Sequence, residues 1–228
     1  MAIASSTNSY LLRTTDLLDY NAAYTVMAWF NHIDASRGFH TLLNIRAGSS
    51  ANQDAIFIDD NTSGFYLQSR TGGVQSEVAS YATSYGWNHI AMRRNSSTSL
   101  DLIANGNTLG TLTPDVSARI APAQTRIGNN FPHAFLSLFA YSAALSNEQI
   151  RDQMNFSNPR RTANLREWLP LESGSARSVD FSGNGRDFTE FGTLSNADGL
   201  LLVRPSLMIP RRACLLCVAT DANGLLMQ

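Results

Sequence analysis

The side chains of this protein that could do acid–base or nucleophilic chemistry are few and lie far apart in the sequence. Hydrolysis of a glycosidic bond needs two carboxyl groups flanking that bond, one as acid and one as nucleophile or base. The five glutamates are scattered over different expected elements: Glu77, Glu148, Glu167, Glu172 and Glu190. The four histidines are isolated, and the sequence has no Gly-x-Ser-x-Gly motif and no phosphate-binding glycine loop. These patterns predict that the chain is not an enzyme, and they leave glycoside hydrolysis as a disfavoured alternative.

Calcium is the metal for which the sequence offers the best ligands. Asp59, Asp60 and Asn61 place three oxygen-bearing side chains at the end of an expected strand, whereas Ca²⁺ takes roughly six to eight oxygen ligands. Three adjacent residues cannot all face one point, so a solvated hairpin turn is the competing interpretation. Asp180, before a Ser-Gly-Asn-Gly turn, is a second candidate. The one Cys-x-x-Cys motif has no second Cys or His pair to complete a zinc site. We therefore expect no cofactor other than calcium.

Aromatic residues in loop-like stretches are candidates for sugar binding. Tyr81, Tyr85, Phe131 and His133 could form an exposed platform, with neighbouring amides and carboxylates as hydrogen-bonding groups. The competing interpretation is that such aromatic residues belong to the core of the domain.

Composition excludes several classes of partner. The formal net charge is -1, which disfavours nucleic acid. All 17 basic residues are arginine, and only 15% of residues are charged, below the average of about 25% for soluble domains. No apolar run approaches the roughly 20 residues of a membrane span. The N-terminal stretch lacks the basic and apolar regions of a signal peptide.

The stretch from Trp87 to Leu112 predicts three consecutive antiparallel strands. Ile90 and Met92 alternate with His89 and its neighbours, and a second alternating run leads to Asn105-Gly106. This dipeptide is the strongest short hairpin indication, because a type I′ turn needs positive φ at both central residues. Such a meander needs a second sheet to cover its apolar face.

This stretch also resembles the laminin G-like, concanavalin A-like jelly roll. The residues that carry the resemblance are Trp87, His89, Ile90, Ala91, Asn105 and Gly106, together with Tyr24–Phe30, Arg126-Ile127-Gly128 and Phe135–Ile150. The resemblance implies an all-β fold, namely a two-sheet antiparallel β-sandwich with one short helix. It also implies a packing role for His89. Hydrolases of this fold carry Glu-x-Asp-x-Glu on one strand, and no such run exists here.

The remaining chain is expected to complete that sandwich. Tyr24–Ile33 is nearly continuous in apolar residues, which indicates a central strand covered on both faces. Thr71–Tyr85 is polar and suggests an edge strand with loops. Ser146 and Gln149 form a capping box for a short helix, which we expect to plug an end of the sandwich. We assign residues 1–203 to the sandwich and 204–228 to an apolar C-terminal tail.

The tail is the sequence feature that most suggests assembly. Its apolar clusters must dock either on a neighbouring subunit or back on the domain, because exposing them would favour aggregation. The expected contact residues are Leu207, Ile209, Arg211, Arg212, Leu215 and Leu216.

These features favour a non-enzymatic structural module of a tailed-phage virion, as a capsid decoration or a tail or fibre subunit. The expected partners are other virion proteins and further copies of the chain as a homo-oligomer. The expected location is the exterior surface of the virion, after assembly in the host cytoplasm. The alternative function is a glycan-binding adhesion module that contacts a host-surface glycan.

Overall fold

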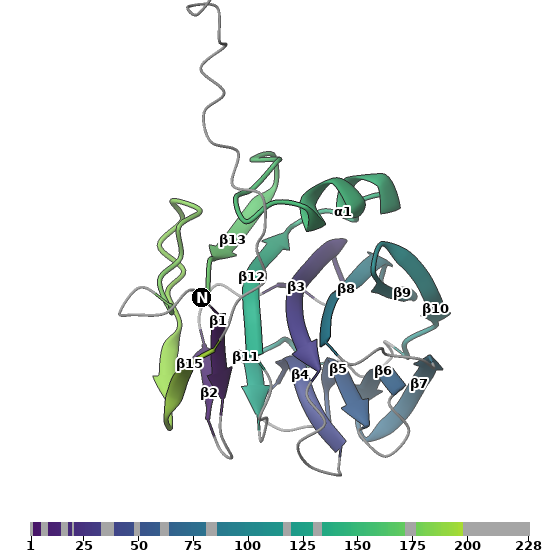
Figure 1. Cartoon of the computed structure of the whole chain (residues 1–228). Helices are drawn as coiled ribbons and strands as arrows, with labels where there is room; N and C mark the ends of the chain where they lie inside the picture. The colour runs from purple at the N-terminus through teal and green to yellow at the C-terminus, as the bar shows by residue number, and fades with distance from the viewer. Residues whose placement is uncertain are drawn as a thin grey trace, which may run out of the picture.

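The computed structural model describes residues 2–5, 9–14, 18–19, 21–32, 39–47, 51–59, 64–80, 86–115, 120–129, 134–171 and 177–197. Two antiparallel sheets pack face to face (Figure 1). Sheet A has the order β10 (Asn107–Leu112), β9 (Ser99–Ala104), β8 (Gly86–Ser96), β3 (Tyr24–His32), β12 (Ala134–Tyr141), β1 (Ala2–Ser5) and β15 (Leu194–Ala197), and β13 (Leu165–Leu169) also pairs with β12. Sheet B has the order β14 (Thr189–Phe191), β2 (Tyr10–Arg13), β11 (Gln124–Asn129), β4 (Phe39–Arg46), β5 (Gln53–Asp59), β6 (Gly64–Thr71) and β7 (Val74–Ser80). The described residues include one α-helix, α1 (Asn147–Met154). The expected two-sheet, all-β jelly roll is confirmed.

Strand β3 is central in sheet A, as its apolar sequence predicts. It pairs with β8 on one side and β12 on the other. Val26 and Phe30 face the core between the sheets, while Met27 is buried on the opposite side. A strand that is covered on both faces needs apolar residues at consecutive positions, which explains its composition.

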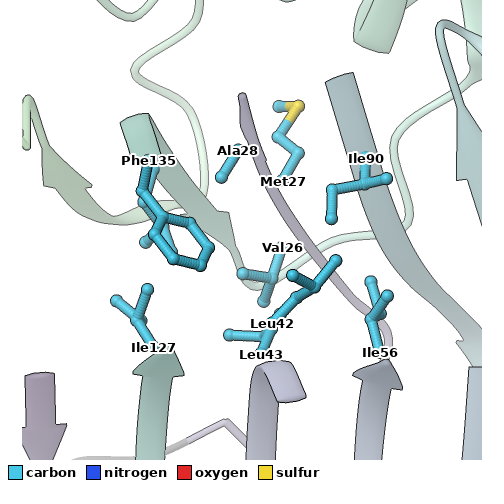
Figure 2. Close-up of a pocket in the computed structure, with 10 residues that line it drawn as sticks. Val26, Met27, Ala28, Leu42, Leu43, Ile56, Ile90, Ile127 and Phe135 are labelled. Carbon is cyan, nitrogen blue, oxygen red and sulfur yellow. The ribbon is translucent and has the colours of Figure 1, made fainter. Parts of the chain in front are cut away.

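The core between the sheets is closely packed. A void of about 10 Å³ lies among apolar residues of both sheets, with Val26 and Ile90 on one side and Leu43 and Ile127 on the other (Figure 2). An apolar void of this size offers no polar partner even to one water molecule. This part of the space between the sheets is therefore core and not a ligand site.

Helix α1 begins at the capping box that the sequence predicts. Ser146 Oγ accepts a hydrogen bond from the Gln149 backbone N–H, and the Ser146 N–H donates to Gln149 Oε1. The expectation that the helix plugs an end of the sandwich is wrong. Its buried Ile150 packs with Met27 and Phe139 on the outward face of sheet A. The apolar side chains on that face explain the position, because they need a cover.

Three strands follow the helix and each joins a sheet. Strand β13 pairs with β12, β14 pairs with β2, and β15 pairs with β1. Strand β7 is an edge strand of sheet B, as the polar stretch Thr71–Tyr85 suggests, and it pairs continuously with β6. Within the described residues, no helix has the length and apolar character needed to cross a membrane.

The Asn105-Gly106 turn has the geometry that its sequence predicts. The two residues have φ angles of 48° and 76°, and they join β9 to β10. The Asn105 side chain also accepts a hydrogen bond from the His89 backbone N–H at 2.9 Å. The turn therefore sets the register of β9 and β10 and is also bonded to β8.

We expect Gly106→Val to lower the free energy of unfolding by more than about 1 kcal/mol, because a β-branched residue is strained at this positive φ. An added Cβ would also lie 2.4 Å from Arg151 Cγ. Urea denaturation of Gly106→Val and of Gly185→Val measures the two effects, because Gly185 has a φ of 67° but open space around it and Gly185→Val therefore carries the backbone strain without the clash. If Gly106→Val is as stable as the parent protein, the turn does not constrain the hairpin as described.

Candidate functional site

Most of the site residues predicted from the sequence lie outside the described residues. This holds for Tyr81, Tyr85, Phe131 and His133, for Asp60 and Asn61, and for the six predicted contact residues of the C-terminal tail, Leu207, Ile209, Arg211, Arg212, Leu215 and Leu216. Asp59 is the last residue of β5, opposite Phe39 of β4. The structure therefore does not test the predicted glycan, calcium and assembly residues.

The strands that flank the predicted glycan and calcium residues do end close together. Gly86 at the start of β8 lies opposite His32 at the end of β3, and Ala134 lies opposite Asn31. In sheet B, Asp59 lies opposite Gly64. The topology therefore brings the strand ends before and after these loops to one end of the sandwich.

Asp180 organises a tight turn. Its Oδ1 accepts hydrogen bonds from the backbone N–H groups of Trp168 and Ser182, at 3.0 and 2.9 Å. Its Oδ2 accepts from the Arg186 N–H at 3.0 Å and from the Ser182 hydroxyl at 2.8 Å. Burial opposes the charged form of Asp180, but these backbone and hydroxyl donors lower its pKa. Both carboxylate oxygens thus already have donors. Among the described residues, no group of three His, Cys, Asp or Glu side chains is placed to hold a metal ion.

His89 occupies a packing position. It is buried, and its ring lies edge-on to Trp29 with the ring centroids 5.3 Å apart. Among the described residues its Nδ1 atom has no hydrogen-bond partner. Burial lowers the pKa of His89 to about 3. His89 is therefore neutral and enclosed near neutral pH, which agrees with the packing role that the resemblance implies.

The four described glutamates lie on four elements: Glu77 on β7, Glu148 on α1, Glu167 on β13 and Glu190 on β14. Glu167 is buried against Arg13 of sheet B in an ion pair that links the sheets. Burial raises the pKa of Glu167 to about 7, and the Arg13 guanidinium opposes this rise. Glu190 pairs with Arg177 at 2.7 Å. These two carboxylates have partners that explain them without catalysis.

The outward face of sheet B carries a continuous field of amide, guanidinium and carboxylate groups, which we call the polar face. Strand pairing places its members side by side from β11 to β7. They are Asn44, Arg46, Gln53, Gln68, Arg70, Gln75, Glu77, Gln124 and Arg126. Their alternate neighbours along each strand, such as Ile45, Ile56 and Leu67, lie in the core. The period-two pattern of the strands therefore produces this face.

Hydrogen bonds run across the polar face in one direction. Asn44 Nδ2 donates to Gln53 Oε1 at 2.8 Å, and Gln53 Nε2 donates to Gln68 Oε1 at 2.9 Å. Gln68 Nε2 then donates to Glu77 Oε2 at 3.0 Å, and Gln75 Nε2 donates to the same oxygen at 2.7 Å. The three amides are buried, whereas Gln75 and Glu77 are exposed. The buried amides thus orient the exposed polar groups at the β7 edge.

An aromatic stack stands at the opposite edge of the polar face. Tyr10 of β2 and Phe191 of β14 are cross-strand partners whose rings stack with centroids 5.0 Å apart and planes 13° apart. Arg126 covers the Tyr10 ring, with its Cζ 4.5 Å from the centroid. Phe191 is 39% exposed, which is high for a large apolar side chain. We call Phe191, Tyr10 and Arg126 the stack.

A hollow of about 320 Å³ lies beside the stack. It is lined by Leu12, Arg13, Thr14, Asp187, Thr189 and Phe191. Leu12 pairs in register with Arg126 and with Thr189, so the hollow adjoins both the stack and the polar face. Sequence analysis missed this region, although the alternation of Tyr10 and Leu12 with buried residues indicates an outward side for β2.

A row of polar groups, with an aromatic stack and a hollow at one edge, thus lies on the outward side of sheet B in a two-sheet sandwich. The sequence profile of the concanavalin A-like lectin/glucanases superfamily matches residues 5–151. The chain belongs to this superfamily. A comparison with curated proteins gives no significant sequence match.

Solved structures share the fold at low sequence identity. A proposed carbohydrate-binding protein from Bacteroides ovatus aligns with a TM-score of 0.61 and 16% identity, over 87% of this chain and 60% of that one. The CBM40 domain of the Ruminococcus gnavus IT-sialidase aligns with a TM-score of 0.54 and 15% identity, over 66% and 95%. The binding domain of botulinum neurotoxin serotype D aligns with a TM-score of 0.55 and 12% identity, over 66% and 41%. The chain thus spans less than two thirds of the first and third of these structures. At these identities the likeness establishes the fold alone.

Proposed function

We propose that this protein is a non-catalytic glycan-binding module and that its ligand binds at the stack and the hollow, at the β2–β14 edge of the polar face. The observation that carries the proposal is the exposed stack of Phe191, Tyr10 and Arg126 beside the hollow. A sugar has apolar C–H faces and polar hydroxyl edges. An aromatic ring can cover the former, and amide, hydroxyl and guanidinium groups can bond the latter.

The polar groups of this face come from strands of one sheet, which hold them more rigidly than loops would. Arg46, Gln124 and Arg126 near the stack, and Gln75 and Glu77 at the β7 edge, are at least partly exposed to solvent. Asn44, Gln53 and Gln68 between them are buried. The binding domains and carbohydrate-binding proteins among the structural neighbours agree with a binding role for the fold.

Non-catalytic binding is preferred over hydrolysis because the described glutamates lie on separate elements. A retaining or inverting glycosidase needs two carboxyl groups facing one bond, roughly 5–9.5 Å apart. Of the polar-face residues, Glu77 alone is a carboxylate. The virion-assembly hypothesis, with its partners and its location on the virion surface, depends on the C-terminal tail and has no support in the described residues. It remains a prediction from the sequence.

The first test is a screen of the purified protein on an oligosaccharide array, followed by calorimetry with the best ligand. We expect Phe191→Ala and Tyr10→Ala to weaken binding at least tenfold, which is about 1.4 kcal/mol. Phe181→Ala is the matched control, because Phe181 is 48% exposed and contacts Trp168 rather than the stack. Melting temperatures of all three variants check folding. Absence of any bound glycan, or an equal loss in Phe181→Ala, would contradict the proposal.

A further inference from the structure

Arg126 differs in its partners from four other buried or half-buried arginines in the described part of the chain. Arg13, Arg93, Arg94 and Arg177 each pair with a carboxylate. Arg126 makes no ion pair within the described part of the chain. Its Nε donates to Gln124 Oε1 at 2.8 Å, and its plane covers the Tyr10 ring. The N–H groups of its two terminal nitrogens therefore have no described acceptor.

The position of this guanidinium is set by three contacts. Tyr10 supports one face, Gln124 holds the Nε side, and strand pairing places Arg126 between Leu12 and Asn44. A guanidinium presents two parallel N–H groups that match the two oxygens of a carboxylate. Because its orientation is already restricted, little side-chain freedom is left to lose on binding an anion.

The surrounding charges favour an anion at this point. Arg46 Nη2 lies 3.2 Å from the same Gln124 Oε1 and adds a second positive charge. Glu77 lies four strands away on β7, at a distance of about 19 Å for a strand spacing of about 4.8 Å. Asp187 is the one carboxylate among the residues that line the hollow. Its Oδ1 accepts a hydrogen bond from the Asp180 N–H at 2.8 Å.

We infer that Arg126 selects glycans that carry a carboxylate, and this inference rests on the proposed glycan-binding function. The carboxylate binds the free fork of Arg126, and the ring of the same sugar enters the hollow next to Leu12. Thr14 and Thr189 line that hollow, and threonine hydroxyls can donate hydrogen bonds to sugar hydroxyls or accept them. Uronic acids and sialic acids share this chemistry, so both are suitable probes.

The test is calorimetry with a galacturonate trisaccharide and with sialyllactose, each compared with its carboxyl-reduced form. We expect the parent protein to bind at least one acidic probe at least tenfold more tightly than its reduced form. Arg126→Gln should abolish that preference, and Arg126→Lys should lose most of it because lysine lacks the planar fork. Arg160→Gln is the matched control, since Arg160 covers the Phe156 ring at 4.4 Å but lies outside the polar face.

The outcomes separate this inference from the proposed function. Equal binding of acidic and reduced forms would overturn the role of Arg126 and leave glycan binding intact. Binding of a sulfated oligosaccharide without binding of either carboxylate probe would also contradict carboxylate selection by Arg126. So would a loss of the preference in Arg160→Gln as large as that in Arg126→Gln. Absence of binding to every glycan, acidic or neutral, would overturn both. Tighter binding of either acidic probe, lost only in the Arg126 variants, would establish the inference and identify the acid.

Discussion

Replacing Asp54 by alanine is expected to lower the free energy of unfolding by about 3–5 kcal/mol, the largest effect that we predict for a single substitution. Asp54 of sheet B pairs with Arg94 of sheet A at 2.5 Å, and both side chains are fully buried. Asp54 also accepts hydrogen bonds from the Tyr24 and Ser69 hydroxyls, each at 2.8 Å. Burial raises the pKa of Tyr24 well above its usual range, so this phenol remains a donor.

The effect is large because Asp54→Ala leaves the positive charge of Arg94 buried without its carboxylate partner. Without Asp54, the Arg94 guanidinium stays in the core and keeps only the carbonyls of Ser96 and Ser97 as acceptors. Urea denaturation measures the change. Asp152→Ala is the control, because Asp152 forms an exposed pair with Arg160 and such pairs contribute about 0–1 kcal/mol. An Asp54→Leu, Arg94→Met double variant should recover much of the loss. A cost for Asp54→Ala no larger than that of Asp152→Ala would show that this pair does not hold the sheets together.

The second large effect concerns His89 and pH. Because burial lowers its pKa in the folded protein from 6.5 to about 3, the unfolded chain takes up a proton below pH 6.5 and the folded protein does not. The stability that depends on neutral His89 is therefore present above pH 6.5 and lost as pH falls. Between pH 7 and 4.5 this loss amounts to about 2 kcal/mol.

The comparison must be made between two proteins, because Glu167 acts in the opposite direction. Because the pKa of Glu167 is raised to about 7 in the folded protein, its contribution to the free energy of unfolding is present at low pH. That contribution is lost as pH rises through 7. Glu167 is common to the parent protein and to His89→Gln, so its effect cancels in their difference. We expect the stability difference between these two proteins to narrow by about 2 kcal/mol from pH 7 to pH 4.5. A difference that stays constant over this range would mean that His89 is not enclosed as described.

Local patterns in the sequence were sufficient for much of the fold. The Asn105-Gly106 turn and the Ser146 capping box are set by residues that are close in the chain. The alternation around Ile90 and Met92 assigned the core face of β8 correctly, because a strand buries every second residue. The position of α1 on sheet A could not be predicted in this way, since it depends on apolar residues of four strands that are distant from it in the chain.

The candidate site was beyond sequence reasoning for the same physical reason. Leu12, Arg126 and Asn44 are neighbours only because β2, β11 and β4 pair, and these strands are not consecutive in the chain. No short motif records that pairing. Tyr10 and Phe191 meet only because β14 returns to the edge of sheet B. The aromatic residues in loops could be proposed from the sequence because they lie in short loop-like stretches. No local pattern indicates that Tyr10 and Phe191 stack.

The location of the bound glycan tests the central claim most directly. Amide chemical shifts of isotopically labelled protein, recorded during titration with the best oligosaccharide from the array, will show which strands contact it. We expect the largest shifts in β2, β11 and β14, around Tyr10, Arg126 and Phe191, with smaller shifts toward β7. Shifts confined to the strand ends around His32, Gly86 and Ala134 would place the ligand at the end of the sandwich and contradict a site on the polar face.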